Sequence, residues 1–194
     1  IRSPHLQRRR PPTRSDMRLI ALAALALAGC TNPQLPRFQA VLAANDSATS
    51  ALGQWCAALG IADPPTIRAL ADRTATARPS AQVRTTLNVG SQEAVGYRHV
   101  RLVCGKTVLS VAHNWYVPER LEPHMNHTLE TTDTPFGSVV APLKFHRERL
   151  AEKRGAMDEC PPGTVLSHRA LLRLPDGNPI SLVVECYTRS NLVK

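Results

Sequence analysis

Alternating polar and apolar positions predict two β-hairpins in the second half of the chain. Residues 97–104 (YRHVRLVC) alternate in this way, and residues 107–117 (TVLSVAHNWYV) follow them after the tight turn Gly105-Lys106. Residues 164–174 and 179–188 repeat the arrangement around a turn that contains Asp-Gly. Strand-like segments separated by short turns of this kind predict antiparallel hairpins.

Helical spacing of apolar residues predicts a helix within residues 44–60, with Asp46 or Ser47 as its N-cap and Gly60 at its end. Weaker patterns predict a short helix at 66–71, a strand at 83–89, a helix at 119–131, a strand at 138–145 and a charged helix at 146–154. The expected fold class is therefore α+β, a mostly antiparallel sheet with helices packed on it.

The first part of the chain has a different texture. Residues 1–16 are rich in Arg and Pro, and we expect them to be upstream sequence rather than part of the fold. Met17-Arg18 then gives a short positive start, followed by the apolar run Leu19–Leu27. This run is shorter than the roughly 20 residues of a membrane-spanning helix. The pattern predicts a secretory signal over residues 17–29.

The four residues Leu27-Ala28-Gly29-Cys30 resemble the lipobox of bacterial lipoproteins. The resemblance implies cleavage before Cys30, lipidation of Cys30, and attachment on the periplasmic side of a bacterial membrane. An ordinary cleaved signal without lipid is the alternative. Residues 30–43 are then expected to form a tether, and residues 44–194 the folded domain.

Export changes the meaning of the charge. The formal charge is +9, but residues 1–29 contain six arginines and one aspartate, so residues 30–194 carry only +4. A mildly basic domain lacks the concentrated positive charge typical of nucleic-acid binding. We therefore expect no nucleic-acid partner.

Four cysteines remain besides Cys30, at positions 56, 104, 160 and 186. In an oxidising compartment this even number permits two disulfides, and the sequence leaves three pairings open. The spacings contain no Cys-x-x-Cys pair. Among His113, His124, His127 and His146, no third ligand supports the i, i+3 pair His124 and His127, so no metal site is expected.

Glu185 interrupts an apolar strand, residues 182–187 (LVVECY). Burying an ionised carboxylate is costly unless it is paired or hydrogen-bonded. Glu185 is therefore either a site residue or the structural partner of an arginine such as Arg169 across the hairpin.

A second group of charged residues occurs at 98–101 (RHVR). In a strand, His99 and Arg101 share one face, whereas Arg98 lies on the face of Val100 and Leu102. An inward-facing cation would suit an anionic ligand, and an exposed charged face is the alternative.

Several segments in order resemble the chorismate–pyruvate lyase family, whose fold is shared with UTRA ligand-binding domains. They are YRHVRLVCGKTVLSVAHNWYVP, LETTDTPFG, LSHRALLRL and PISLVVECY, and the match covers most of residues 50–194. The resemblance implies a site between a sheet and covering flaps. It also implies an activity that releases pyruvate from chorismate and leaves 4-hydroxybenzoate, without cofactor or metal.

In that family, two arginines hold the carboxylates and a glutamate contacts the hydroxyl end of the ring. By position, the glutamate falls on Glu185, and the first arginine falls on or beside His99, with Arg98 the nearest arginine. The second arginine falls on Asn114. A closing turn, Thr-Pro-Phe-Gly, contributes Phe136 and Gly137.

Asn114 carries no charge, whereas a dicarboxylate is best held by two fixed cations. Chorismate is also a cytoplasmic intermediate, whereas this chain is expected to be exported. We therefore expect a retained pocket that binds a small aromatic or carboxylate ligand. An active lyase using Arg98 or His99 with Glu185 is one alternative. The other is a structural or interaction lipoprotein in which Phe136, Trp115 and Tyr116 fill the pocket.

Overall fold

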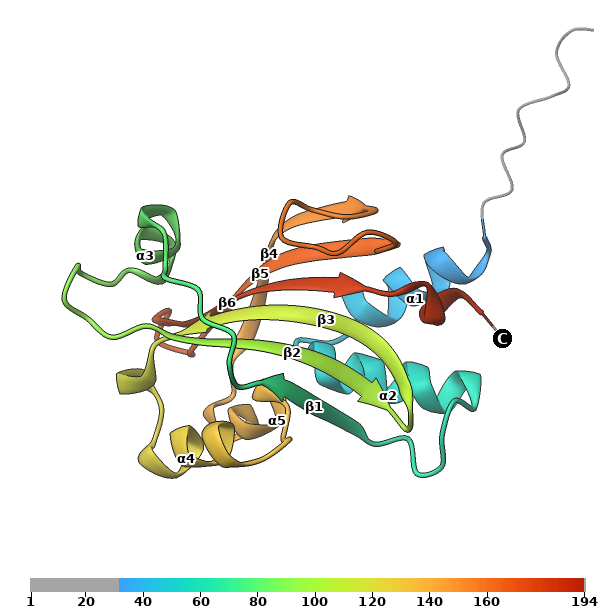
Figure 1. The fold of residues 1–194 in the computed structure, drawn as a ribbon, viewed down its shortest axis with the longest axis horizontal. Helices are drawn as coiled ribbons and strands as arrows, with labels where there is room; N and C mark the ends of the chain where they lie inside the picture. Colours follow the sequence, from blue (N-terminus) through green and yellow to red (C-terminus); the bar gives the residue numbers. More distant parts are fainter. Residues whose placement is uncertain (1–31, 194) are drawn as a thin grey trace, which may run out of the picture. The chain divides into compact units, whose positions relative to one another are not determined.

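A single antiparallel sheet of six strands forms the centre of the protein, in the order β1-β2-β3-β6-β5-β4 (Figure 1). The computed structural model describes residues 32–193, so the predicted signal peptide and Cys30 lie outside the described residues. The strands are β1 (Ile67–Asp72), β2 (Gly96–Cys104), β3 (Thr107–Tyr116), β4 (His146–Arg154), β5 (Leu166–Arg173) and β6 (Pro179–Tyr187). The predicted α+β class is confirmed.

Both predicted hairpins are present, as β2–β3 and β5–β6. Strand β3 pairs with β6, with Ala112 opposite Glu185, and this pairing joins the two hairpins at the centre of the sheet. Strands β1 and β4 form the two edges. All nine residues of β6 are buried, which explains why its sequence is almost continuously apolar.

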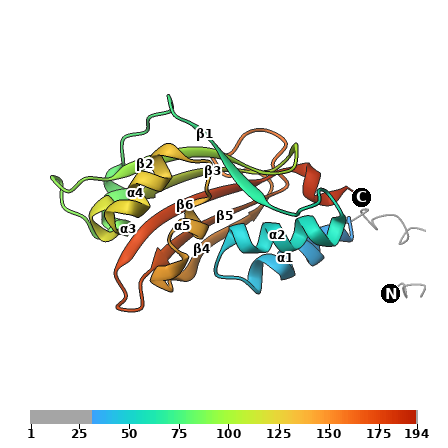
Figure 2. The same cartoon turned by 90° about the horizontal axis from the view of Figure 1, so that it is seen from below.

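Helices cover both faces of the sheet. They are α1 (Gln34–Ala43), α2 (Ala48–Leu59), α3 (Ala81–Leu87), α4 (Pro123–Thr131) and α5 (Phe136–Val139), with short 3-10 turns at Pro118–Arg120, Ala141–Leu143 and Arg189–Leu192. Helix α3 lies on the opposite side of the strands from α4 and α5 (Figure 1). Helices α1 and α2 lie side by side at one end of the sheet (Figure 2). Among residues 32–193, no helix has the length and apolar character needed to cross a membrane.

The predicted tether, residues 30–43, is wrong where the structure describes it, because Gln34–Ala43 form helix α1. Phe38 and Leu42 lie one helical turn apart and are both buried in the core. The ring of Phe38 contacts Trp55 and Tyr187 at centroid distances of 5.3 and 5.1 Å. These aromatic contacts hold the segment against the domain.

The prediction of a helix within 44–60 is confirmed as α2. The Ser47 hydroxyl accepts a hydrogen bond from the backbone N–H of Ser50, and Gly60 ends the helix with φ of 62°. One disulfide joins Cys56 in α2 to Cys104 in β2. The other disulfide joins Cys160 to Cys186 in β6. The structure thus selects one of the three pairings that the sequence left open.

Two predicted elements near the first edge of the sheet are wrong. Residues 67–71 of the predicted helix 66–71 lie in strand β1, since their backbone pairs with β2. Residues 83–89 fall largely in helix α3 rather than in a strand. The Ser80 hydroxyl accepts a hydrogen bond from the backbone N–H of Val83 and caps the helix. This N-cap stabilises α3 although its sequence contains several β-branched residues.

The structure also differs between residues 119 and 154. The predicted helix at 119–131 is confirmed only as α4, after a 3-10 turn. Residues 138–145 form the end of α5 and a second 3-10 turn, so the predicted strand is wrong. Residues 146–154 form the edge strand β4, because pairing with β5 outweighs the helix propensity of Arg, Glu, Ala and Lys.

Candidate functional site

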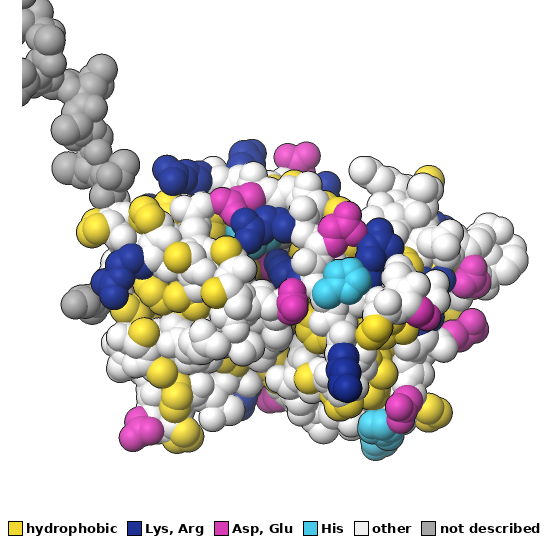
Figure 3. Space-filling model, turned by 180° about the vertical axis from the view of Figure 1, so that it is seen from behind, with side chains coloured by type: hydrophobic (Ala, Val, Ile, Leu, Met, Phe, Trp, Pro, Cys, Tyr) yellow, Lys and Arg dark blue, Asp and Glu magenta, His cyan; other side chains and the backbone are white. Residues whose placement is uncertain are grey.

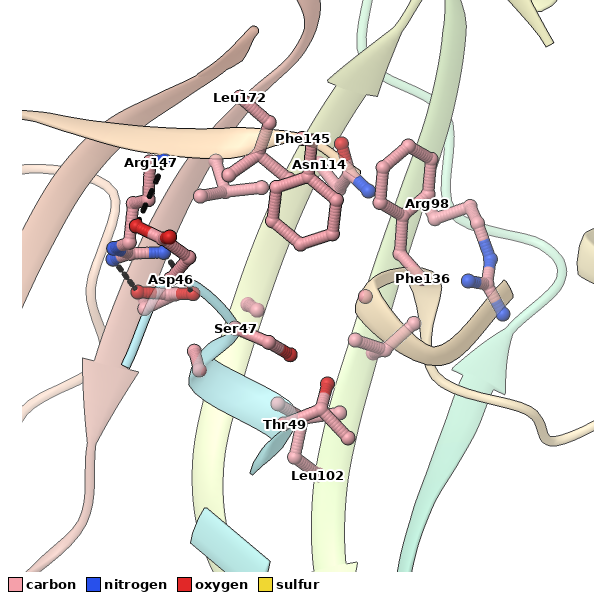
Figure 4. Close-up of a pocket in the computed structure, with 16 residues that line it drawn as sticks. Asp46, Ser47, Thr49, Arg98, Leu102, Asn114, Phe136, Phe145, Arg147 and Leu172 are labelled. Carbon is pink, nitrogen blue, oxygen red and sulfur yellow. Dashed lines mark hydrogen bonds and ion pairs between the residues drawn. The ribbon is translucent and has the colours of Figure 1, made fainter. Parts of the chain in front are cut away.

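A pocket lies on the face of the sheet that α2 and α5 cover (Figure 4). Strands β2, β3 and β6 form its floor with Arg98, Asn114 and Glu185, and Phe136 and Phe145 cover it. Its volume is about 50 Å³. Apart from His99, every predicted site residue among those described lines this pocket.

A more open groove of about 580 Å³ borders the pocket, and the two share Asp46, Ser47, Gly137 and Phe145 among their lining residues. The start of α2 and helix α5 therefore form the boundary between pocket and groove. At Gly137 a Cβ atom would meet the Ser47 Oγ at 2.7 Å. The close approach of these two elements depends on glycine at this position.

Arg98 lines one end of the pocket, and its side chain extends past Phe136 (Figure 4). It lies on β2 directly opposite Asn114 and is 8% exposed. Its Nε and Nη2 atoms are buried and have no hydrogen-bond partner within the described part of the chain. Burial lowers the pKa of Arg98, because desolvation disfavours the charged form.

His99 is not in the pocket. Its Nδ1 atom lies 4.0 Å from Asp72 and its ring stacks on His113, both on the opposite face of the sheet. This placement follows from the alternation of side chains along a strand. Of the two positions proposed for the first arginine of the lyase pattern, the structure brings Arg98 to the pocket and leaves His99 outside it.

Glu185 lies at the other end of the pocket and is fully engaged with neighbours. Both of its carboxylate oxygens accept hydrogen bonds from the Arg147 guanidinium, and one also accepts from the Tyr187 hydroxyl at 2.8 Å. Burial alone would raise the pKa of Glu185, but the Arg147 charge and these hydrogen bonds hold it below its usual value. Arg169, the partner considered from the sequence, pairs instead with Glu159.

Arg147 is a pocket residue that sequence reasoning missed. It projects from β4, which the sequence predicted as a helix, and its side chain is 8% exposed. Burial alone would lower the pKa of Arg147, but attraction to Glu185 raises it. A signal was present in the sequence. A buried Glu185 requires a cation nearby, and Arg147 lies in the charged segment 146–154 (HRERLAEKR).

Asn114 lies between the two arginines on the pocket floor (Figure 4). It is buried, and its side-chain oxygen accepts a hydrogen bond from the Ser181 hydroxyl. Its amide group is therefore oriented by β6. Asn114 can donate a hydrogen bond to a ligand but cannot neutralise a second carboxylate.

Beside the ion pair lies a buried histidine, His168, directly opposite Glu185 on β5. Its Nε2 atom is 3.1 Å from a Glu152 oxygen. Burial nevertheless lowers the pKa of His168, and the charges of Arg147 and Arg149 add to this effect. Charged side chains of both signs gather around the middle of the face seen in Figure 3.

Among residues 32–193, no three His, Cys, Asp or Glu side chains are grouped as they would be around a metal ion. His124 and His127 both lie on α4, and no residue at a supporting spacing in the sequence offers a third ligand to this pair. The expectation that the protein works without metal or cofactor stays a prediction.

The fold resembles solved structures of one class. The effector domain of PhnF from Mycobacterium smegmatis superposes with a TM-score of 0.56 at 11% identity, over 75% of this chain and 90% of that domain. PhnF itself gives the same TM-score and identity over 76% of this chain, which spans 65% of PhnF. The domain therefore has the chorismate lyase-like fold of UTRA-type effector domains.

Sequence comparison identifies a closer relative. The chain is 39% identical over 178 residues to the protein described as "Uncharacterized protein y4mC" from Sinorhizobium fredii, covering 81% of this chain and 75% of that protein. This chain belongs to the same family as y4mC. No family model matches the sequence.

Proposed function

We propose that the pocket between the sheet and helices α2 and α5 binds a small aromatic carboxylate through Arg98. The observation that carries this proposal is the burial of the Arg98 Nε and Nη2 atoms without a hydrogen-bond partner among residues 32–193. An unpaired buried charge is costly. A carboxylate would pair with two parallel N–H groups of the guanidinium and remove that cost.

The ion pair of Arg147 limits the charge of the ligand that the pocket can hold. Arg147 is already neutralised by Glu185, so among the described residues that line the pocket Arg98 is the one arginine without an ion pair. Asn114 adds a neutral donor beside Arg98. These groups suit a ligand with one carboxylate, and they count against the dicarboxylate chorismate as substrate.

The walls of the pocket favour an apolar, flat ligand body. Phe136 and Phe145 lie over the floor, which includes Val100, Leu102 and Val183. Pockets for drug-sized ligands usually enclose roughly 300–1,000 Å³. The volume of about 50 Å³ is smaller than such a ligand, so binding requires the residues that cover the pocket to move apart. The description of the similar PhnF structure as an effector domain also supports a ligand-binding role.

Calorimetric titration with benzoate, 4-hydroxybenzoate and benzamide tests this proposal. The two carboxylates should bind, whereas benzamide, which has the same shape without the charge, should bind at least tenfold more weakly. Arg98→Gln should abolish carboxylate binding. Arg101→Gln is the matched control, because Arg101 is exposed on the same strand and lies on the other face. Equal binding of benzoate and benzamide would contradict the proposal.

The lyase alternative has its own test. Incubation with chorismate should give no 4-hydroxybenzoate above the spontaneous rate if the pocket only binds ligands. Product formation that depends on Glu185 would establish the lyase and replace the present proposal.

We also propose that the domain is exported and held at a membrane by lipid on Cys30. The support is the Leu27-Ala28-Gly29-Cys30 sequence after an apolar run, together with two disulfides in the domain, which are typical of oxidising compartments. Labelling cells with an acyl-chain analogue should mark the protein, and Cys30→Ser should remove the label. A labelled Cys30→Ser variant would refute the anchor.

A further inference from the structure

A second cavity, of about 250 Å³, lies on the opposite face of the sheet. Its floor includes Trp115 from β3 with Leu182 and Val184 from β6, and α3 lies beside it. It shares no lining residue with the pocket around Arg98, and the sheet separates the two. It is therefore independent of the function proposed above.

Trp115 lines this cavity and carries an unused hydrogen-bond donor. The residue is 8% exposed, and its indole Nε1 atom is buried without a partner in the portion of the chain that the structure describes. Buried indole N–H groups usually have a partner. The neighbouring ring of Tyr97 shows the usual situation, since its hydroxyl bonds to His113 at 2.7 Å.

Glu159 brings an unused acceptor to the same cavity. One carboxylate oxygen accepts a hydrogen bond from Arg169, while Oε2 is buried and has no partner among residues 32–193. The segment that carries Glu159 is fixed in place. Its backbone carbonyl lies 3.0 Å from His113 Nε2, and the adjacent Cys160 is joined by a disulfide to Cys186. The backbone that carries Glu159 is thus tied to the sheet.

The electrostatics of this cavity favour a neutral ligand. Arg169, which also lines the cavity, offsets the charge of Glu159. The remaining walls combine apolar side chains such as Leu182 with the polar side chains of Gln82 and Thr86 in α3 and of its N-cap Ser80. A neutral group that accepts from the indole and donates to the carboxylate would satisfy both atoms, and a hydroxyl group does both.

We propose that this cavity is a second binding site, which takes a neutral hydroxylated ring of about the size of one sugar. The ligand accepts a hydrogen bond from Trp115 Nε1 and donates one to Glu159 Oε2. Leu182 and Val184 contact the apolar side of the ring.

Nitrogen-15 NMR of the full chain tests the site through the Trp115 indole resonance. The probes are the methyl glycosides of glucose and galactose, with glucuronate and glucosamine as charged counterparts. At least one neutral glycoside should shift the Trp115 signal with a millimolar dissociation constant, and it should bind more tightly than both charged sugars. The indole of Trp55 is an internal reference, because it donates to the Asn191 carbonyl on the other face.

Two variants locate the site. Glu159→Gln should weaken glycoside binding about tenfold, since an amide nitrogen or a weaker acceptor replaces the carboxylate oxygen. Glu148→Gln should leave it unchanged, because Glu148 pairs with Arg173 on the same face and does not line the cavity.

Three results would overturn the proposal. The first is the absence of any Trp115 shift with both neutral glycosides at tens of millimolar, which would leave only a hydrated cavity. The second is equal or tighter binding of glucuronate. The third is equal weakening by Glu159→Gln and Glu148→Gln. The comparison of neutral and charged sugars uses the unaltered protein, so it remains decisive if a variant fails to fold.

Discussion

Arg147 and Arg98 line the same pocket but have opposite electrostatic surroundings. Arg147 donates two hydrogen bonds to Glu185, whereas the buried Nε and Nη2 atoms of Arg98 have no partner in the described structure. A paired buried cation is part of the folded structure: removing its partner leaves an uncompensated buried charge and lowers the free energy of unfolding. An unpaired one lowers the stability of the ligand-free protein. We therefore propose that Arg147 serves the fold and that Arg98 binds the ligand.

Glu185→Gln should have the largest effect, because it removes the carboxylate that pairs with the buried Arg147 guanidinium. Breaking a buried ion pair in this way typically costs about 3–5 kcal/mol. Urea unfolding followed by circular dichroism would measure the loss in free energy of unfolding. Glu148→Gln is the control, since an exposed pair contributes only about 0–1 kcal/mol. Equal losses in the two variants would show that the Glu185–Arg147 pair contributes no more to the free energy of unfolding than an exposed ion pair.

Tyr187→Phe should have the next largest effect. It removes the hydroxyl that donates to Glu185 while keeping the ring that contacts Phe38. Hydrogen bonds to charged groups contribute about 1.5–3 kcal/mol, so the loss should fall in that range. The same urea experiment applies. Combined with Glu185→Gln, the change should cost little more, and full additivity would contradict a shared network.

Arg98→Met should change stability in the opposite direction. It replaces an unpaired buried cation with an apolar side chain that fills similar space, so the ligand-free protein should gain about 1 kcal/mol. Thermal unfolding would detect the gain, and carboxylate binding should disappear. Arg101→Met, on the exposed face, should leave both properties unchanged. A destabilised Arg98→Met protein would mean that Arg98 has a structural partner and that the contrast with Arg147 is wrong.

The smallest predicted effect is a pH dependence around the ion pair. Burial lowers the pKa of His168 below the ordinary value of about 6.5, so the unfolded chain binds its proton more readily. The stabilisation is then present above that value and is lost as the pH falls from about 7 to about 5. Glu185 also has a lowered pKa, but its contribution is lost only below the ordinary glutamate range.

Unfolding free energies of the wild type and His168→Gln at both pH values would check this dependence. The variant should lose less stability on acidification. Some loss should remain, because burial also lowers the pKa of His113. Identical losses in the two proteins would exclude His168 as the source.

The hairpins β2–β3 and β5–β6 were predictable because strand alternation and tight turns are local signals. Strand β4 was not, since its residues favour a helix when isolated and become a strand only by pairing with β5. Helix α1 was missed for a related reason. Prolines at 33 and 36 made the segment resemble a tether, and the burial of Phe38 and Leu42 follows only from the core that they fill.

The site residues also differ in how far the sequence predicted them. Arg98 and Asn114 were both expected as residues of one pocket, and pairing of β2 with β3 places them directly opposite each other. Glu185 was recognised as an unusual carboxylate, but its partner Arg147 comes from β4, whose strand character and register the sequence did not reveal. His99 was retained as a candidate because the family pattern was uncertain by one residue, and one residue reverses the face of a strand.

The most direct test of the contrast between the two arginines is NMR of their side-chain Nε–Hε groups during titration with benzoate. We predict that the Arg98 signal shifts with saturation while the Arg147 signal stays in place. Benzamide should move neither. A shift of Arg147 alone, or no shift of Arg98 while benzoate binds, would contradict the assignment of Arg98 as the ligand-binding cation.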